Sequence, residues 1–334
     1  IVQGGMGVGV SLSSLAGNVA KCGGVGTISG VHPGYREADF KENPFRANLR
    51  AIGNELEKAK EIASGGIIGF NFMTVMNHYE EYVKEAIAAG ADFIVSGAGL
   101  PANLAKYAAG TRAAILPIVS SARALKLIVK QWQRADRLPD AVVVEGPLAG
   151  GHLGYPYGHL VDGTFDTLED SLVDVVDYVQ ELEEKNGVKI PVVAGGGVRN
   201  HADMERLMAL GASGVQVGTK FVATEECDAA PAFKQAYLRS RKEDVQLIES
   251  PVGLAARAIR NSFLEKVEKQ GRIPVQRCYQ CMNHCKQAET KYCISQALID
   301  AVQGREGLVF CGANAYEIEK LSTVEKVMQE LCGE

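Results

Sequence analysis

Two glycine-rich stretches near the middle of the chain carry the strongest structural signal: Val192-Val193-Ala194-Gly195-Gly196-Gly197-Val198 and Val215-Gln216-Val217-Gly218-Thr219-Lys220-Phe221. Each begins with a short β-branched run and continues into glycine, so each predicts a strand that ends at a strand-to-helix turn. Glycine adopts positive φ at no steric cost and lets a ligand approach the backbone. Free N–H groups at such turns, and at the start of the following helix, bind anions. Two successive strands of this kind are typical of the phosphate site after strands seven and eight of a (β/α)8 barrel.

Eight short apolar runs predict parallel strands, and helical patterns separate most of them. Alternating strands and helices imply parallel pairing with right-handed crossovers, and eight such units imply a closed barrel. An open doubly wound sheet is the alternative architecture. We therefore expect a (β/α)8 TIM barrel over residues 1–224 and a helical C-terminal extension over residues 225–334, where no further strand–turn–helix unit occurs. The eight runs are Ile1–Gln3, Gly26–Ser29, Ile67–Asn71, Phe93–Ser96, Ile115–Val119, Ala141–Glu145, Ile190–Ala194 and Gly214–Gly218.

The composition restricts the classes of partner. The 334 residues are 46% hydrophobic, enough for a large core, and the net charge of −5 comes without a long basic run. This balance argues against nucleic acid and anionic membrane as main partners. No apolar run reaches the roughly 18 residues of a membrane-spanning helix, and no signal peptide is recognised. Eight cysteines, four of them clustered, fit a reducing compartment. We expect a cytoplasmic protein with a small-molecule substrate, and a homodimer is left open.

Small residues occur at nearly every predicted strand end, where the active site of such a barrel lies. They leave a broad, shallow floor that suits a flat ring system bound through backbone contacts. The competing interpretation is that these glycines only serve tight turns. The residues in question are Gly4, Gly5 and Met6 after the first strand, Asn71, Gly97 and Ser120 after the third, fourth and fifth, Glu145 and Gly151 after the sixth, and Gly195, Gly196, Gly197, Gly218 and Thr219 after the last two.

His152 is the strongest candidate for acid–base chemistry. It lies in Gly150-Gly151-His152-Leu153-Gly154, so we expect it on a loop over the site rather than in a helix. An unperturbed histidine titrates near pH 6.5, which suits proton transfer at neutral pH. The alternative is a histidine that caps a turn or binds a backbone carbonyl.

In combination, these motifs resemble the FMN-dependent barrel family of nitronate monooxygenases (2-nitropropane dioxygenases) and flavin-dependent enoyl-ACP reductases. The resemblance implies bound FMN, with its phosphate on Gly195, Gly196, Gly197, Gly218 and Thr219 and its ring near Gly4, Gly5, Met6, Asn71 and Gly97. It also places His152 on the catalytic histidine of the family. The matching segments follow the family's order through residues 1–221: Ile1–Gly7, Gly69–Asn71, Ser96–Gly99, Pro117–Ser121, Gly150–Gly154, Ala194–Val198 and Val217–Thr219.

The resemblance leaves the reaction open. In a nitronate monooxygenase, His152 would act on the proton α to the nitro group, and O₂ would be consumed. In an enoyl-thioester reductase, the alternative, it would help to position or protonate the substrate, and NAD(P)H would be consumed. The turn from Glu145 to His152 is longer than is usual in the family, which puts the substrate class in doubt. A non-catalytic binder of a phosphorylated ligand is the hypothesis from another class.

A cysteine cluster departs from the family pattern. Cys278, Cys281, Cys285 and Cys293 have the spacing C-x2-C-x3-C-x7-C. Four thiolates this close in sequence suit a [4Fe–4S] cluster or a structural zinc ion, and reduced core or redox thiols are the third alternative. Cys311 is a substitute ligand if Cys293 is not used. A redox cluster would favour the reductase, because a cluster can supply electrons to a flavin.

Overall fold

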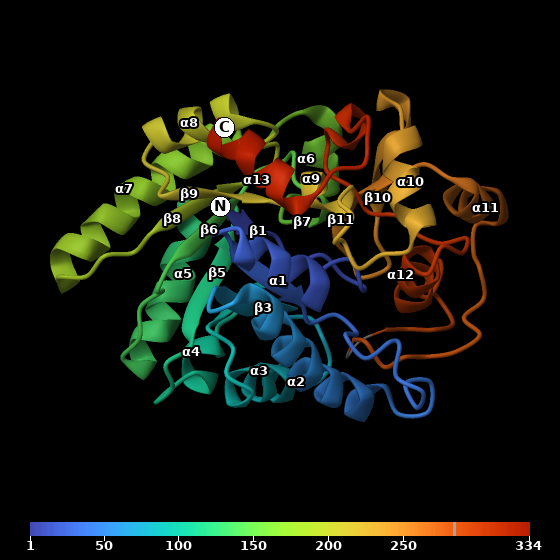
Figure 1. Ribbon diagram of the computed structural model, residues 1–334, viewed down its shortest axis with the longest axis horizontal. Helices are drawn as coiled ribbons and strands as arrows, with labels where there is room; N and C mark the ends of the chain where they lie inside the picture. The colour runs from blue at the N-terminus through green and yellow to red at the C-terminus, as the bar shows by residue number, and fades with distance from the viewer. Residues whose placement is uncertain (283–284) are drawn as a thin grey trace.

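A computed structural model describes residues 1–282 and 285–334 (Figure 1). Eight parallel strands close into a barrel in the order β1-β2-β3-β4-β5-β6-β8-β9, and β9 pairs with β1 to complete the ring. Each predicted apolar run falls on one of these strands, so the predicted (β/α)8 TIM barrel is confirmed. The strands are β1 (Val2–Gln3), β2 (Val25–Ser29), β3 (Ile67–Met73), β4 (Phe93–Gly97), β5 (Ala114–Val119), β6 (Val142–Glu145), β8 (Val192–Gly195) and β9 (Gly214–Val217).

Helices connect the barrel strands and cover the outside of the barrel (Figure 1). Those between barrel strands are α1 (Ser13–Lys21), α2 (Pro44–Ala63), α3 (Tyr79–Ala88), α4 (Leu104–Tyr107), α5 (Ala122–Trp132), α6 (Tyr157–Asp162), α7 (Leu168–Asn186) and α8 (His201–Ala209). After β9 follow α9 (Thr219–Val222), α10 (Pro231–Arg239), α11 (Ser262–Gln270), α12 (Ile294–Val302) and α13 (Val324–Cys332). Short 3-10 turns occupy Gln133–Ala135, Lys242–Asp244 and Ala315–Glu317.

Side-chain alternation along the strands separates two apolar layers. Alternate residues on β4, β5, β6 and β8 point into the barrel and form an inner cluster, whereas their neighbours join the large core between strands and helices. Gly69 on β3 makes room in the inner layer, because a Cβ atom there would lie 2.4 Å from the ring of Phe93. The same alternation turns Asn71, two residues further along β3, toward the barrel interior near the end of the strand.

The C-terminal part of the chain contains a sheet that the sequence analysis did not expect. Strands β10 (Val245–Glu249) and β11 (Ala255–Ile259) form an antiparallel hairpin, and β11 also pairs with β7 (Gly151–Leu153) from the connection after β6. The extension is therefore helical only in part, and it is joined to the barrel by backbone hydrogen bonds.

The remaining elements of the extension lie around this sheet. In Figure 1, α10, α11 and α12 gather on one side of the barrel, and α13 returns to pack against α1 and α8. Among the helices of residues 1–282 and 285–334, none has both the length and the apolar character that crossing a membrane requires.

Candidate active site at the carboxyl end of the barrel

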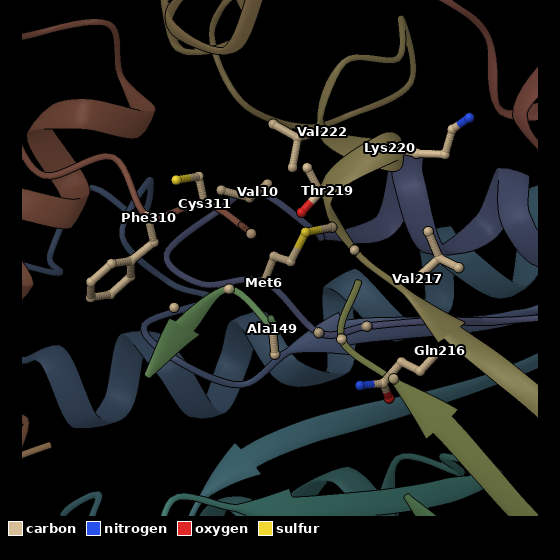
Figure 2. Close-up of a pocket in the computed structure, with 18 of the residues that line it drawn as sticks. Met6, Val10, Ala149, Gln216, Val217, Thr219, Lys220, Val222, Phe310 and Cys311 are labelled. Atoms are coloured by element: carbon tan, nitrogen blue, oxygen red, sulfur yellow. The ribbon is translucent and has the colours of Figure 1, made fainter. Parts of the chain in front are cut away.

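A pocket of about 460 Å³ lies at the carboxyl ends of the barrel strands. This volume is within the usual range of small-molecule and cofactor sites. Figure 2 shows that its lining comes from distant parts of the chain, with Met6 after β1, Thr219 after β9, and Phe310 and Cys311 from the extension. The pocket brings together every residue that the sequence analysis proposed for the cofactor except Ser120: Gly4, Gly5, Met6, Asn71, Gly97, Glu145, Gly151, Gly195, Gly196, Gly197, Gly218 and Thr219.

The glycine turns after β8 and β9 form one wall of the pocket. Gly196 and Gly197 have φ angles of +102° and +96°, a conformation that favours glycine. Among the described residues, no hydrogen-bond acceptor faces the backbone N–H groups of Gly196, Gly197 and Thr219. The sulfur of Met6 lies beside Gly218, 3.4 Å from where a Cβ atom would stand. These turns therefore present free amide donors to the pocket, as an anion requires.

The opposite part of the lining is built for close backbone approach. A Cβ atom on Gly5 would lie 2.4 Å from Cβ of Asn71, so only glycine fits beside that side chain. The Asn71 amide Nδ2 donates to the Val95 carbonyl oxygen at 3.2 Å, which fixes its orientation. A Cβ atom on Gly97, at the end of β4, would lie 3.0 Å from Cβ of Ile118. The result is a smooth surface of backbone and small side chains.

Glu145 carries the carboxyl group at the bottom of the pocket. It is the last residue of β6, and burial raises its pKa to about 8, although the nearby guanidinium of Arg257 acts in the opposite direction. At neutral pH the carboxyl group is therefore mostly protonated and can donate a hydrogen bond. Arg257 on β11 is itself buried, and its guanidinium donates to the carbonyl oxygens of Pro147, at 3.0 Å, and Ala149. These bonds hold the long turn that follows Glu145.

His152 lines the same pocket, but it lies on a strand and not on the expected free loop. The long turn after β6 lets residues 151–153 form β7, in which His152 stands opposite Ala256 of β11. Its Nε2 atom is 2.8 Å from Oγ of Ser250, and its ring meets that of Phe310 edge to face at 5.0 Å. Burial lowers the pKa of His152 to about 4, well below the unperturbed value on which the sequence argument relied.

A segment of the extension, residues 310–314, closes one side of the pocket. Cys311 N–H donates to the Arg257 carbonyl at 3.0 Å, and Ala313 N–H donates to the Leu148 carbonyl at 3.1 Å. Gly312 passes so close to Thr219 that a Cβ atom would lie 2.4 Å from its Oγ1. Sequence reasoning missed Ser250, Arg257 and Phe310, because each reaches the site from the extension, about one hundred residues or more beyond its contact in residues 149–152.

Two candidates of the sequence analysis, Ser120 and Cys311, lie elsewhere than the pattern suggested. Ser120 is outside the pocket lining, because the turn after β6 folds over the end of β5, and its hydroxyl donates to the Gly154 carbonyl at 3.2 Å. Cys311 lines the pocket and not the surroundings of the other clustered cysteines, so it is not a substitute ligand there. His159 is exposed on α6 and takes no part in the lining.

The clustered cysteines gather around a second, small cavity in the extension. Cys278, Cys281, Cys285 and Cys293 all line it. All eight cysteines belong to the described residues, and each is a free thiol. Within the described ranges, no group of three or more histidine, cysteine, aspartate or glutamate side chains is arranged to hold a metal ion.

Comparison with known proteins agrees with this geometry. The chain matches the family model "Nitronate monooxygenase" over residues 1–334. A probable nitronate monooxygenase of Staphylococcus saprophyticus is 26% identical over 290 residues, which cover 80% of this chain and 78% of that protein. One of Staphylococcus haemolyticus is 36% identical over 136 residues, which cover 40% of this chain and only 36% of the relative's length.

Two solved structures share the fold at low sequence identity. FabK from Thermotoga maritima has a TM-score of 0.74 at 23% identity, and the match covers 99% of this chain and 91% of that one. Nitroalkane oxidase from Streptomyces ansochromogenes has a TM-score of 0.71 at 18% identity, with 100% and 94% covered. Since the family match extends over the whole chain, the protein belongs to the nitronate monooxygenase family and is an oxidoreductase.

Proposed function

We propose that the protein binds FMN in the pocket and oxidises a small nitronate or nitroalkane, with His152 in proton transfer. One observation carries the proposal: His152 lines the same pocket as the glycine turns with free amide donors. The relatives named as probable nitronate monooxygenases support the choice of substrate class.

The residues around the pocket fit FMN. The amides of Gly196, Gly197 and Thr219 are donors without acceptors in the described part of the chain, which suits a phosphate. The flat backbone surface around Gly5 and Asn71 suits an aromatic ring system. We assign the phosphate to Gly195, Gly196, Gly197, Gly218 and Thr219, and the ring to the neighbourhood of Gly4, Gly5, Met6, Asn71, Gly97, Glu145 and Gly151. Residues 1–224 would thus hold the cofactor, and residues 225–334 would complete the wall around it.

When bound, FMN supplies the electron acceptor, and the protein supplies position and proton transfer. His152 is neutral at neutral pH because burial lowers its pKa to about 4. Its Nε2 atom is engaged with Ser250. For Nδ1 to accept the substrate proton, Nε2 must carry the hydrogen and donate it to Ser250 Oγ. With a pKa of about 4, His152 is a weak base, so it would hold the substrate proton only briefly before passing it to solvent.

The protonated carboxyl group of Glu145 has a separate task. Burial keeps it neutral up to a pH of about 8, so it offers a hydrogen bond without placing a charge in the pocket. A neutral donor suits the recognition of a polar atom on the ring or substrate, because an ionised carboxylate there would repel an anionic nitronate.

The test combines flavin content with turnover. The purified full chain should contain FMN and should consume O₂ with the nitronate of a small nitroalkane in the absence of NAD(P)H. The variant His152→Ala should keep FMN and lose turnover by roughly 10²–10⁴, the usual scale for losing a general acid or base. His159→Ala, which changes an exposed histidine outside the lining, is the matched control.

The outcomes separate this proposal from its competitors. Unchanged turnover in His152→Ala would remove the histidine from the mechanism. Consumption of NADH or NADPH with an enoyl thioester, without nitronate oxidation, would replace the proposal by an enoyl-thioester reductase. A protein that takes up no FMN even when supplied with it would leave a phosphate-ligand binder.

A further inference from the structure

The four clustered cysteines converge in space. Cys278, Cys281, Cys285 and Cys293 come from a stretch without helix or strand in its described part, yet all four line one small cavity. Much of the remaining lining is apolar or aromatic, with Val275, Tyr292 and Ile294 as examples, and its described part contains no carboxylate or imidazole. The described part of the cavity therefore offers sulfur as its metal-binding donor.

The backbone around the first two cysteines is fixed. Gln280, between Cys278 and Cys281, has a φ angle of +51°, which turns the chain sharply between the two thiols. Its N–H donates to Sγ of Cys278 at 3.4 Å, a type of bond that stabilises anionic sulfur. Asn77, from the connection between β3 and α3, binds this turn on its other side. Its N–H donates to the Cys281 carbonyl at 3.1 Å, and its Nδ2 donates to the Gln280 carbonyl at 2.7 Å.

The fourth cysteine is fixed by a helix. Cys293 is the N-cap residue of α12 and is partly buried. In the first turn of α12, Ser295 Oγ lies 2.8 Å from Nε2 of the buried His32, which ties the start of the helix to the barrel. The cysteine stretch is thus bonded to the rest of the molecule near both of its ends.

Four thiols around one cavity suit an iron–sulfur cluster, because each thiolate of such a cluster binds a different iron atom and four separate cysteines are its usual ligand set. Four cysteines are also a usual ligand set of a structural zinc ion, so the test below distinguishes the two metals. We propose that Cys278, Cys281, Cys285 and Cys293 ligate a [4Fe–4S] cluster.

The cysteine cavity lies close to the pocket at the carboxyl end of the barrel, because α12 connects the two. Helix α12 starts next to Cys293, and its Leu298 lines the pocket. These two residues are five positions apart, which corresponds to about 7.5 Å along a helix. A cluster bound by Cys293 would therefore lie within about two turns of α12 from a residue of the pocket wall.

The test measures the metal itself, so it does not depend on the proposed function. The full chain, purified without oxygen, should contain about four iron and four acid-labile sulfide per chain. Cys281→Ser and Cys293→Ser should lose most of both, whereas Cys332→Ser, which changes an exposed cysteine outside the cavity, should keep them. Thermal unfolding and FMN content report whether each variant still folds. If Cys281→Ser and Cys293→Ser do not fold, Cys278→Ser replaces them. In addition, iron is removed reversibly from the unaltered protein with a chelator.

Three results would overturn the proposal. The first is about one zinc per chain with no iron, which would identify a structural ion. The second is failure to take up iron and sulfide after anaerobic reconstitution with ferrous iron, sulfide and a thiol reductant. The third is equal loss of iron in Cys332→Ser, which would mean that the iron is bound adventitiously.

Discussion

Removing the hydroxyl of Ser250 tests whether the extension orients the proposed catalytic histidine. Ser250 lies in the turn between β10 and β11, is 5% exposed, and has its Oγ 2.8 Å from Nε2 of His152. Ser250→Ala leaves Nε2 of His152 without this partner. The imidazole then no longer prefers the tautomer that carries its hydrogen on Nε2 and keeps Nδ1 available as a base. A hydrogen bond of this kind contributes about 1–2 kcal/mol when its loss leaves a partly buried group unpaired. That free energy corresponds to a decrease in kcat/KM of about fivefold to thirtyfold.

The assay is nitronate-dependent O₂ uptake, with the FMN content of each variant measured in parallel. Ser213→Ala is the matched control, because Ser213 Oγ accepts a hydrogen bond from Val192 N–H at 3.3 Å at the opposite end of the barrel. Its kcat/KM should stay within about twofold of the unaltered enzyme, since a surface or distant substitution rarely costs more than about 0.5 kcal/mol.

The decisive comparison is a double-mutant cycle with His152→Ala. If Ser250 acts only through His152, adding Ser250→Ala to His152→Ala should change kcat/KM by less than about twofold. A decrease as large as in the unaltered background would show that Ser250 acts on the substrate or the fold directly, and the orientation argument would be wrong.

Three other substitutions probe the cofactor wall and its supports. Gly218→Val should lower FMN retention with little change in the melting temperature of the apoprotein, because φ at Gly218 is −117° and only Met6 lies near its Cβ position; normal flavin content would contradict the proposed phosphate site. Gly196→Val should also unfold more easily, by roughly 2 kcal/mol or more, because its φ is +102° and the Cβ would meet the Gly146 carbonyl at 3.0 Å; a thermal melt measures this. Glu145→Gln should remain active at pH 7 and lose the alkaline decrease expected as the native carboxyl ionises near its pKa of about 8, and an unchanged pH–rate profile would argue against that role. Because this pKa is raised above the unfolded value, the free energy of unfolding should fall between about pH 4.5 and pH 8 in the native protein and much less in Glu145→Gln.

The barrel could be predicted from the sequence because its signals are local. Each strand is a short apolar run between helices, and the strand ends that carry Gly5, Asn71 and Gly195 must meet at one end of a closed barrel. Topology alone therefore assembled most of the cofactor wall, without any knowledge of side-chain contacts.

The remaining part of the site depends on pairing between distant segments. Gly151–Leu153 is too short and too rich in glycine to predict a strand, and it becomes one only because β11 lies beside it. A signal for the hairpin is present in the short, largely apolar run Val245–Glu249 followed by the turn Pro251-Val252-Gly253, but nothing in it indicates a partner in the barrel. The low pKa of His152 was equally out of reach, because it results from burial under that hairpin.

The pairing of β7 with β11 also constrains the order in which the protein becomes competent. During synthesis the barrel strands emerge first. Strand β7, which carries His152, has no partner until the residues of β11 have been made. Helix α13 is made later still and packs on α1. A nascent chain can thus build the glycine turns long before it can orient His152. We expect cofactor capture to precede the gain of activity, because the segments that orient His152 are translated after those that form the glycine turns.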